Sequence, residues 1–210
     1  MASTSPKTQI IPKTLLASAI SVLLMNAPTV ANADAGDLMF RVGGSIVAPQ
    51  DDNGLGLDVD DGYSLTFTGS YFITDQFAIE LLAAWPFTHD IAAEGGGGDI
   101  AETKHLPPTL SAQWHFIPDG KFRPYIGAGL NYTLFFDEEI DGADLSLDRS
   151  FGFAAQVGVD IELTESMFLN FDLRYIDIAT DAKVNGTQIG EVEIDPLIFG
   201  VHVGWRFGSN

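Results

Sequence analysis

The side chains in this chain that could ligate a metal or transfer a proton are four histidines and 29 aspartates and glutamates. His89, Asp90 and His105 flank one stretch, but the chain has no H-x-x-x-H or H-E-x-x-H pattern, so no spacing fixes a zinc geometry. Cysteine is absent, which excludes disulfides, thiolate ligands and thiol nucleophiles. The sequence therefore predicts neither a metal site nor a cofactor.

Two further motifs look like known site loops without meeting their requirements. The acidic stretch 51–62 lacks the third ligand and the final glutamate of an EF-hand, so we expect a solvated loop. The run Gly127-Ala128-Gly129 lies inside a segment of alternating polarity and is not a dinucleotide-binding fingerprint. No serine sits in a nucleophile elbow, which removes the support for hydrolase chemistry. The chain is accordingly predicted not to be an enzyme.

Charge and composition exclude further classes of protein. The 210 residues include ten basic and 29 acidic ones, which gives a formal net charge of −19. Nucleic-acid binding needs a basic surface, so nucleic acid is not an expected partner. Hydrophobic residues make up 46% and aromatic residues 11%, which argues against disorder. Valine, isoleucine, phenylalanine, tyrosine and threonine are spread evenly, as is typical of β-structure.

The N-terminal segment has the pattern of a secretory signal peptide. Lys7 and Lys13 precede an apolar run over 15–25, and Ala31-Asn32-Ala33 matches a cleavage site. The run is too short to span a bilayer as a helix, which takes about 20 residues. We therefore expect residues 1–33 to be a signal peptide, cleaved near Ala33-Asp34, and residues 34–210 to form one domain.

Eight segments of that domain alternate between apolar and polar residues, which is typical of β-strands. Their apolar faces cover 38–46, 63–73, 77–87, 106–116, 126–136, 151–163, 167–175 and 197–207. Tight turns are expected at 74–75, 118–122 and 164–166. Long loops are expected at 49–61, 88–104, 137–150 and 178–194. Short turns at one end and long loops at the other favour an all-β, eight-stranded antiparallel up-and-down transmembrane β-barrel.

The alternation does not by itself say which face points inward. A soluble ligand-binding barrel would turn the apolar face inward, but the interior of eight strands cannot hold so many large apolar side chains. Aromatic residues also fall at both ends of the segments, as in the girdles of a membrane barrel. The expected lower girdle is Tyr71, Trp114, Phe116, Trp205 and Phe207. The expected upper girdle is Tyr63, Trp85, Phe87, Phe136 and Tyr175.

The inward face is expected to divide by height. Its lower part mixes acids and bases that must pair when buried, which predicts an ionic plug. The plug residues are Arg41, Glu80, Asp160, Asp172, Arg174 and Arg206. The upper part is much less charged and predicts an apolar funnel open to the outside. Its channel-lining residues are Val47, Leu82, Ala84, Pro86, Thr109, Phe135 and Ile198.

Two features of the inward face suggest how a solute would move. Leu82 lies at mid-height and is the candidate constriction, with ordinary interior packing as the alternative. Pro86, Pro107 and Pro108 lack backbone donors near the upper parts of two neighbouring segments. Pro107 and Pro108 are the candidate lateral seam, through which a solute could leave the wall. The alternative is that these prolines only end the strands at the rim.

The chain resembles the OmpW family of eight-stranded outer-membrane barrels. The resemblance rests on 80–84 (Glu-Leu-Leu-Ala-Ala), 105–110 (His-Leu-Pro-Pro-Thr-Leu), 122–133 (Phe-Arg-Pro-Tyr-Ile-Gly-Ala-Gly-Leu-Asn-Tyr-Thr) and 156–160 (Gln-Val-Gly-Val-Asp). These motifs are spread over nearly the whole of 34–210. The resemblance implies a Gram-negative outer-membrane location and passive uptake of small hydrophobic molecules, with sideways release into the bilayer.

Two other functions stay open from the sequence. A structural or adhesive barrel would act through its acidic extracellular loops and carry nothing, and a secreted soluble barrel would bind a ligand. The expected partners are outer-membrane lipids, lipopolysaccharide and small hydrophobic solutes. Loose bridging of divalent cations between the acidic loops and lipopolysaccharide phosphates is a further alternative.

Overall fold

The computed structural model describes residues 34–49, 57–59, 61–93, 99–140 and 143–208. The predicted signal peptide lies outside these residues. Eight strands form a ring in the order β10-β11-β14-β1-β3-β4-β7-β8, and β8 pairs with β10 to close it. The bounds are β1 Leu38–Ala48, β3 Gly62–Phe72, β4 Phe77–Ala84, β7 Thr109–His115, β8 Phe122–Ile140, β10 Ser150–Glu162, β11 Met167–Ile176 and β14 Leu197–Phe207.

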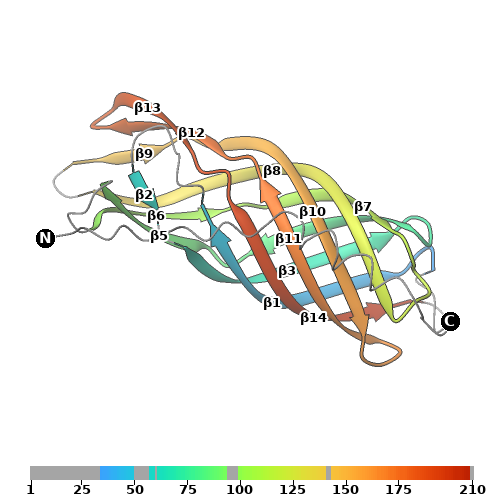
Figure 1. Ribbon diagram of the computed structural model, residues 1–210. Helices are drawn as coiled ribbons and strands as arrows, with labels where there is room; N and C mark the ends of the chain where they lie inside the picture. Colours follow the sequence, from blue (N-terminus) through green and yellow to red (C-terminus); the bar gives the residue numbers. More distant parts are fainter. Residues whose placement is uncertain (1–33, 50–56, 60, 94–98, 141–142, 209–210) are drawn as a thin grey trace, which may run out of the picture.

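All pairs in this ring are antiparallel, and the first and last strands meet side by side along their full length, from Leu38↔Phe207 to Ala48↔Leu197 (Figure 1). The predicted closed, eight-stranded barrel is therefore confirmed. Within the described ranges no helix has the length and apolar character needed to cross a membrane.

The turns at one end of the barrel are tight, and two of them use the same device. The backbone N–H groups of Phe77 and Met167 each donate to the side-chain oxygen of a threonine three residues earlier, at 3.0 Å. These threonines are Thr74 and Thr164. A short hydroxyl side chain can take over a backbone hydrogen bond in this way, which is why such residues favour turns.

The other end is built of further strands rather than of loops alone (Figure 1). The expected loops 88–104 and 178–194 are mostly β-hairpins, so those loop predictions were wrong. The strands there are β2 Leu57–Val59, β5 Phe87–Ala93, β6 Asp99–Leu106, β9 Leu145–Leu147, β12 Ala179–Val184 and β13 Thr187–Glu193. Asn185 and Gly186 have φ values of 50° and 76°, the backbone that a two-residue hairpin turn requires.

Burial in the barrel is the reverse of that in a soluble protein. Phe153 on the outer face is 71% exposed, whereas Arg41 on the inner face is 1% exposed. Large apolar side chains line the outside of every barrel strand, and Trp85, which directly follows β4, is 70% exposed. An apolar outer wall around a polar interior suits a barrel surrounded by lipid. The soluble alternative needed the opposite arrangement.

Inside the barrel, aromatic rings lie across glycines of neighbouring strands. The ring of Tyr125 lies where a Cβ of Gly158 would be, and the ring of Phe168 lies where a Cβ of Gly204 would be. Any side chain at these glycines would displace a fully buried ring, which is a severe form of overpacking.

We expect Gly204→Val to destabilise the folded barrel by about 1–3 kcal/mol or more, the cost of overpacking. The measurement is the temperature at which the purified barrel in detergent loses its folded gel mobility. Gly44→Val is the control, because a Cβ at Gly44 would have no heavy atom within 4 Å. Equal melting of the two variants would contradict the packing described here.

Candidate functional site

Five charged side chains form one buried network across the barrel. Glu80 forms ion pairs with two guanidinium groups, with Arg41 Nη1 at 2.9 Å from Oε2 and Arg174 Nη2 at 2.9 Å from Oε1. Arg41 Nη2 also lies 3.0 Å from Asp160 Oδ2, and Arg174 Nε donates to Asp172. All five side chains are at most 4% exposed. Because buried charges must be paired, the network holds its own strands together.

Neutral polar groups extend this network to further strands. Asn170 Nδ2 donates to Asp160 Oδ1 at 2.8 Å, and Asn170 Oδ1 lies 3.1 Å from His202 Nδ1. His202 Nε2 lies 2.7 Å from the hydroxyl of Thr66, which in turn lies 2.7 Å from that of Ser45. The bonded groups come from β1, β3, β4, β10, β11 and β14. They fill the middle of the barrel with polar side chains.

The predicted ionic plug is therefore brought together for five of its six residues. Arg206 lies elsewhere, because its Nε is 3.8 Å from Asp37 Oδ2 and its Nη2 donates to the backbone oxygen of Glu165 at 3.3 Å. These partners belong to the end of the barrel with the tight turns. Arg206 and the network share an inward face but differ in height.

A layer of buried rings closes the barrel below the network. Phe72 and Phe168 pack with Met39 and Ala78, and the guanidinium of Arg41 lies 5.4 Å from the centre of the Phe168 ring. Tyr125 stacks on His115 at 5.0 Å. Sequence reasoning missed Phe72, Phe168 and Tyr125 as interior groups. Phe72 and Phe168 are separated from the inward polar residues of their strands by even numbers of positions. The alternation therefore predicts that both side chains point into the barrel.

An apolar cluster lies above the network. It contains predicted lining residues Val47 and Ile198, with Ala84 and Phe135 packed against it. Its other buried members are Phe87, Ala154, Ile176, Ile178, Ala182, Val192 and Ile194. Four of these come from β12, β13 and their flanks, the segment expected to be a loop. The hairpin therefore extends the apolar interior beyond the predicted residues.

Leu82, Thr109 and Pro86 lie outside this cluster. Leu82 is buried on β4 between Glu80 of the network and Ala84. Thr109 is buried opposite Leu82, and its hydroxyl donates to the backbone oxygen of Pro107 at 3.1 Å. Pro86 is half-buried between β4 and β5. Leu82 thus stands at the boundary between charged and apolar layers.

The wall is interrupted where the prolines lie. The pairing of β4 with β7 ends at Leu82↔Thr109, and the pairing of β5 with β6 begins at Phe87↔His105. Between these two pairs, the segment that joins β4 to β5 has four residues, 83–86. The segment that joins β6 to β7 has three, 106–108. The extra residue is a bulge, which reverses the direction of the side chains that follow it.

The bulge corrects one prediction directly. Phe87 was expected in the outer aromatic girdle, but it is 1% exposed and points into the barrel. Its ring stacks on His105 with centroids 5.4 Å apart, and His105 lies 6.1 Å from the ring of Phe135. Three rings from β5, β6 and β8 therefore meet just above the interrupted wall.

Backbone groups at the interruption form hydrogen bonds to the strands on either side and not across the gap. Trp85 N–H donates to Leu65 O on β3 at 2.7 Å, and Tyr132 N–H donates to Pro108 O from β8 at 3.0 Å. Pro107 and Pro108 themselves have no N–H to offer across the gap. We name 83–86 and 106–108 together the proline seam.

The closed ring, the lipid-facing wall and the charged interior define an eight-stranded outer-membrane β-barrel. The family model described as "OmpW family" matches residues 34–207, and the chain belongs to this family. It is 40% identical over 216 residues to outer membrane protein W of Vibrio cholerae, covering 93% of this chain and 99% of that protein. The protein accordingly resides in the outer membrane.

Two further similarities bear on the fold and the site. The crystal structure of the outer membrane protein OprG from Pseudomonas aeruginosa matches with a TM-score of 0.77 at 30% identity, over 86% of this chain and 100% of that chain. The dibenzothiophene metabolism operon protein PahQ of Pseudomonas aeruginosa is 30% identical over 156 residues, covering 71% of this chain and 74% of that protein.

Proposed function

We propose that this barrel is a passive uptake channel for small hydrophobic molecules. The observation that carries the proposal is the layered interior, in which an apolar cluster stands above a paired ionic network. An apolar solute can rest among Val47, Ile176 and Ile198 without stripping water from a charged group. Polar solutes gain nothing in that layer, because they would lose water without finding partners.

The network makes a straight path to the periplasm unfavourable. A solute on that path would have to separate Arg41 and Arg174 from their carboxylates, and each exposed charge would then lack a partner. The buried rings of Phe72 and Phe168 lie beneath it. An apolar solute therefore needs an exit above the network.

We place that exit at the proline seam. The seam lies level with the floor of the apolar layer, immediately above the Leu82↔Thr109 pair. Opening it breaks few backbone hydrogen bonds, because three of its residues, Pro86, Pro107 and Pro108, are prolines. In addition, the Trp85 N–H bonds to β3 and the Pro108 oxygen accepts from β8, so neither bond crosses the gap. A solute that passes between 83–86 and 106–108 would enter the bilayer directly, where apolar molecules are most soluble.

The relatives support an apolar cargo. PahQ is named for dibenzothiophene metabolism, and so is the similar DoxH of Pseudomonas sp., which is also 30% identical over 156 residues. Dibenzothiophene is a fused aromatic compound with no charged group. We infer that solutes of this kind, small and aromatic or aliphatic, are the substrates of the present channel.

Closing the seam should slow uptake. The double substitution Pro107→Thr and Pro108→Thr restores two backbone donors and favours continuous pairing of this edge. We expect the initial rate of naphthalene uptake by intact cells to fall severalfold, at equal amounts of folded protein. Pro124→Thr, in β8 at the opposite end of the wall, is the matched control and should leave the rate unchanged. An unaltered rate in the double variant would contradict lateral release at this seam.

A further inference from the structure

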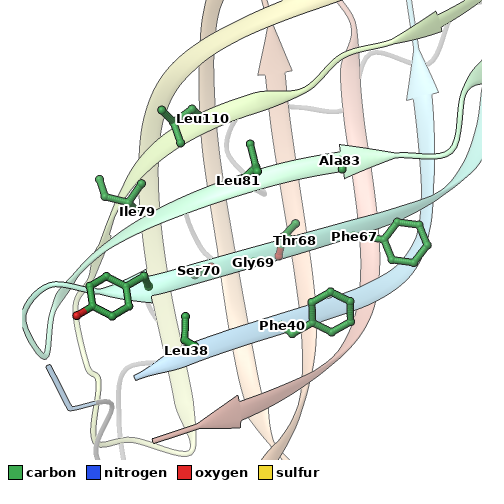
Figure 2. Close-up of a pocket in the computed structure, with 11 residues that line it drawn as sticks. Leu38, Phe40, Phe67, Thr68, Gly69, Ser70, Ile79, Leu81, Ala83 and Leu110 are labelled. Atoms are coloured by element: carbon green, nitrogen blue, oxygen red, sulfur yellow. The ribbon is translucent and has the colours of Figure 1, made fainter. Parts of the chain in front are cut away.

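A groove on the outer wall is separate from the interior described above. It has a volume of about 560 Å³ and lies over β1, β3, β4 and β7 (Figure 2). Apolar and aromatic side chains form its sides, namely Leu38, Phe40, Phe67, Tyr71, Leu81 and Leu110. Its position on the lipid-facing surface means that lipid, rather than water, surrounds it.

The floor of the groove is a glycine in the middle of a strand. Gly69 is directly opposite Phe40 on β1 and Leu81 on β4, so the wall steps down between two large side chains. A Cβ at Gly69 would have no heavy atom within 4 Å. The neighbouring Thr68 and Ser70 turn their side chains into the barrel, where both are buried. A glycine inside a strand weakens it and often marks the close approach of another group.

The groove lies in the half of the membrane next to the tight turns. Its β3 residues directly precede the turn that begins at Ile73, and Leu38 is the first residue of β1. Short turns of such barrels face the periplasm, so the groove faces the periplasmic leaflet. The phenol of Tyr71, 49% exposed, stands at the edge of the apolar band, the level that tyrosine prefers in membranes.

We propose that this groove holds one acyl chain of a periplasmic-leaflet phospholipid more firmly than the rest of the wall does. Contact between apolar surfaces within a bilayer has no hydrophobic driving force, so the gain comes from van der Waals packing and depends on shape. A chain lying over Gly69 touches Phe40 and Leu81 on both sides. No charged side chain lines the groove, so retention should not depend on the headgroup.

This proposal does not depend on the uptake function, and native mass spectrometry tests it. The full-length barrel is purified from cells in one mild detergent as wild type, Gly69→Leu and Gly44→Leu. Each preparation is then supplied with equal amounts of dipalmitoyl phosphatidylethanolamine and dipalmitoyl phosphatidylglycerol. Gly44 is the matched control, because it is also an exposed strand glycine with open space around it and does not line the groove. Gly69→Ala is a milder version should the leucine variant fail to fold.

We expect wild type and Gly44→Leu to retain one phospholipid per barrel, of either headgroup. Gly69→Leu should retain about tenfold less, the loss expected when roughly ten van der Waals contacts disappear. Gly69→Ala should fall between them. Equal retention in all variants would overturn the proposal, and so would a preference for one headgroup. A dimer that Gly69→Leu alone abolishes would overturn it in favour of a second copy of the chain as the occupant.

Discussion

Arg41→Met is expected to destabilise the folded barrel by about 3–5 kcal/mol, the cost of breaking a buried ion pair from one side. Arg41 is 1% exposed and supplies two nitrogens to Asp160, at 3.3 and 3.0 Å, and one to Glu80. Glu80 keeps Arg174 when Arg41 is lost, whereas Asp160 loses both hydrogen bonds from the Arg41 guanidinium and keeps the one from the amide of Asn170. The penalty therefore falls on a buried carboxylate that has lost the cation hydrogen-bonded to it.

A compensating variant separates this cause from lost packing. Adding Asp160→Asn to Arg41→Met removes the unpaired charge and should recover a large part of the stability, as coupled neighbours do. The measurement is thermal unfolding of the purified barrel in detergent, followed by folded gel mobility. Glu191→Ala, exposed on β13, is the control for loss of one charge and should change stability by less than about 0.5 kcal/mol. No recovery in the double variant would show that charge pairing is not what stabilises this layer.

Leu82→Arg is expected to reduce hydrophobic uptake to the level of cells that lack the protein. The new guanidinium would stand two residues above Glu80, within the boundary between the ionic network and the apolar cluster. It would bring water into the layer that an apolar solute must cross, and would lie beside the lower edge of the proline seam. Glu80 is already paired with Arg41 and Arg174, so the amount of folded Leu82→Arg protein is measured together with its uptake.

Leu82→Met is the matched control, since it keeps the volume and apolar character of the site. It should transport at about the wild-type rate. The comparison is valid at equal amounts of heat-modifiable, folded protein in the outer membrane. Wild-type uptake by Leu82→Arg would place the solute path elsewhere than past this residue.

The alternation of side chains made the barrel predictable. Period-two segments give eight strands, and the large apolar side chains could only face outward because eight strands enclose a small interior. The same alternation correctly turned Val47, Glu80 and Asp160 inward. These predictions depend only on local chain geometry and on the surrounding solvent. The alternation of residue types in the sequence indicates both.

The predictions that were wrong depend on the register between neighbouring strands. Phe87 points inward because one extra residue precedes it in the bulge at 83–86. The bulge is defined by comparison with the partner strand, so alternation along one strand does not reveal it. Arg206 shares the inward face with Arg41 but pairs with Asp37, since height in a tilted barrel follows from pairing rather than from sequence position. The hairpin β12–β13 contains the turn signal Asn185-Gly186, which lies within the expected loop 178–194.

The central claim is that small apolar molecules enter through this barrel, and their uptake by intact cells tests it most directly. Initial rates of naphthalene uptake are compared between cells with the wild-type protein, cells without it and cells with Leu82→Arg. We predict faster uptake with the wild type and background uptake in the other two. Equal rates in all three, with the protein present and folded in the outer membrane, would contradict the channel and favour a structural or adhesive barrel.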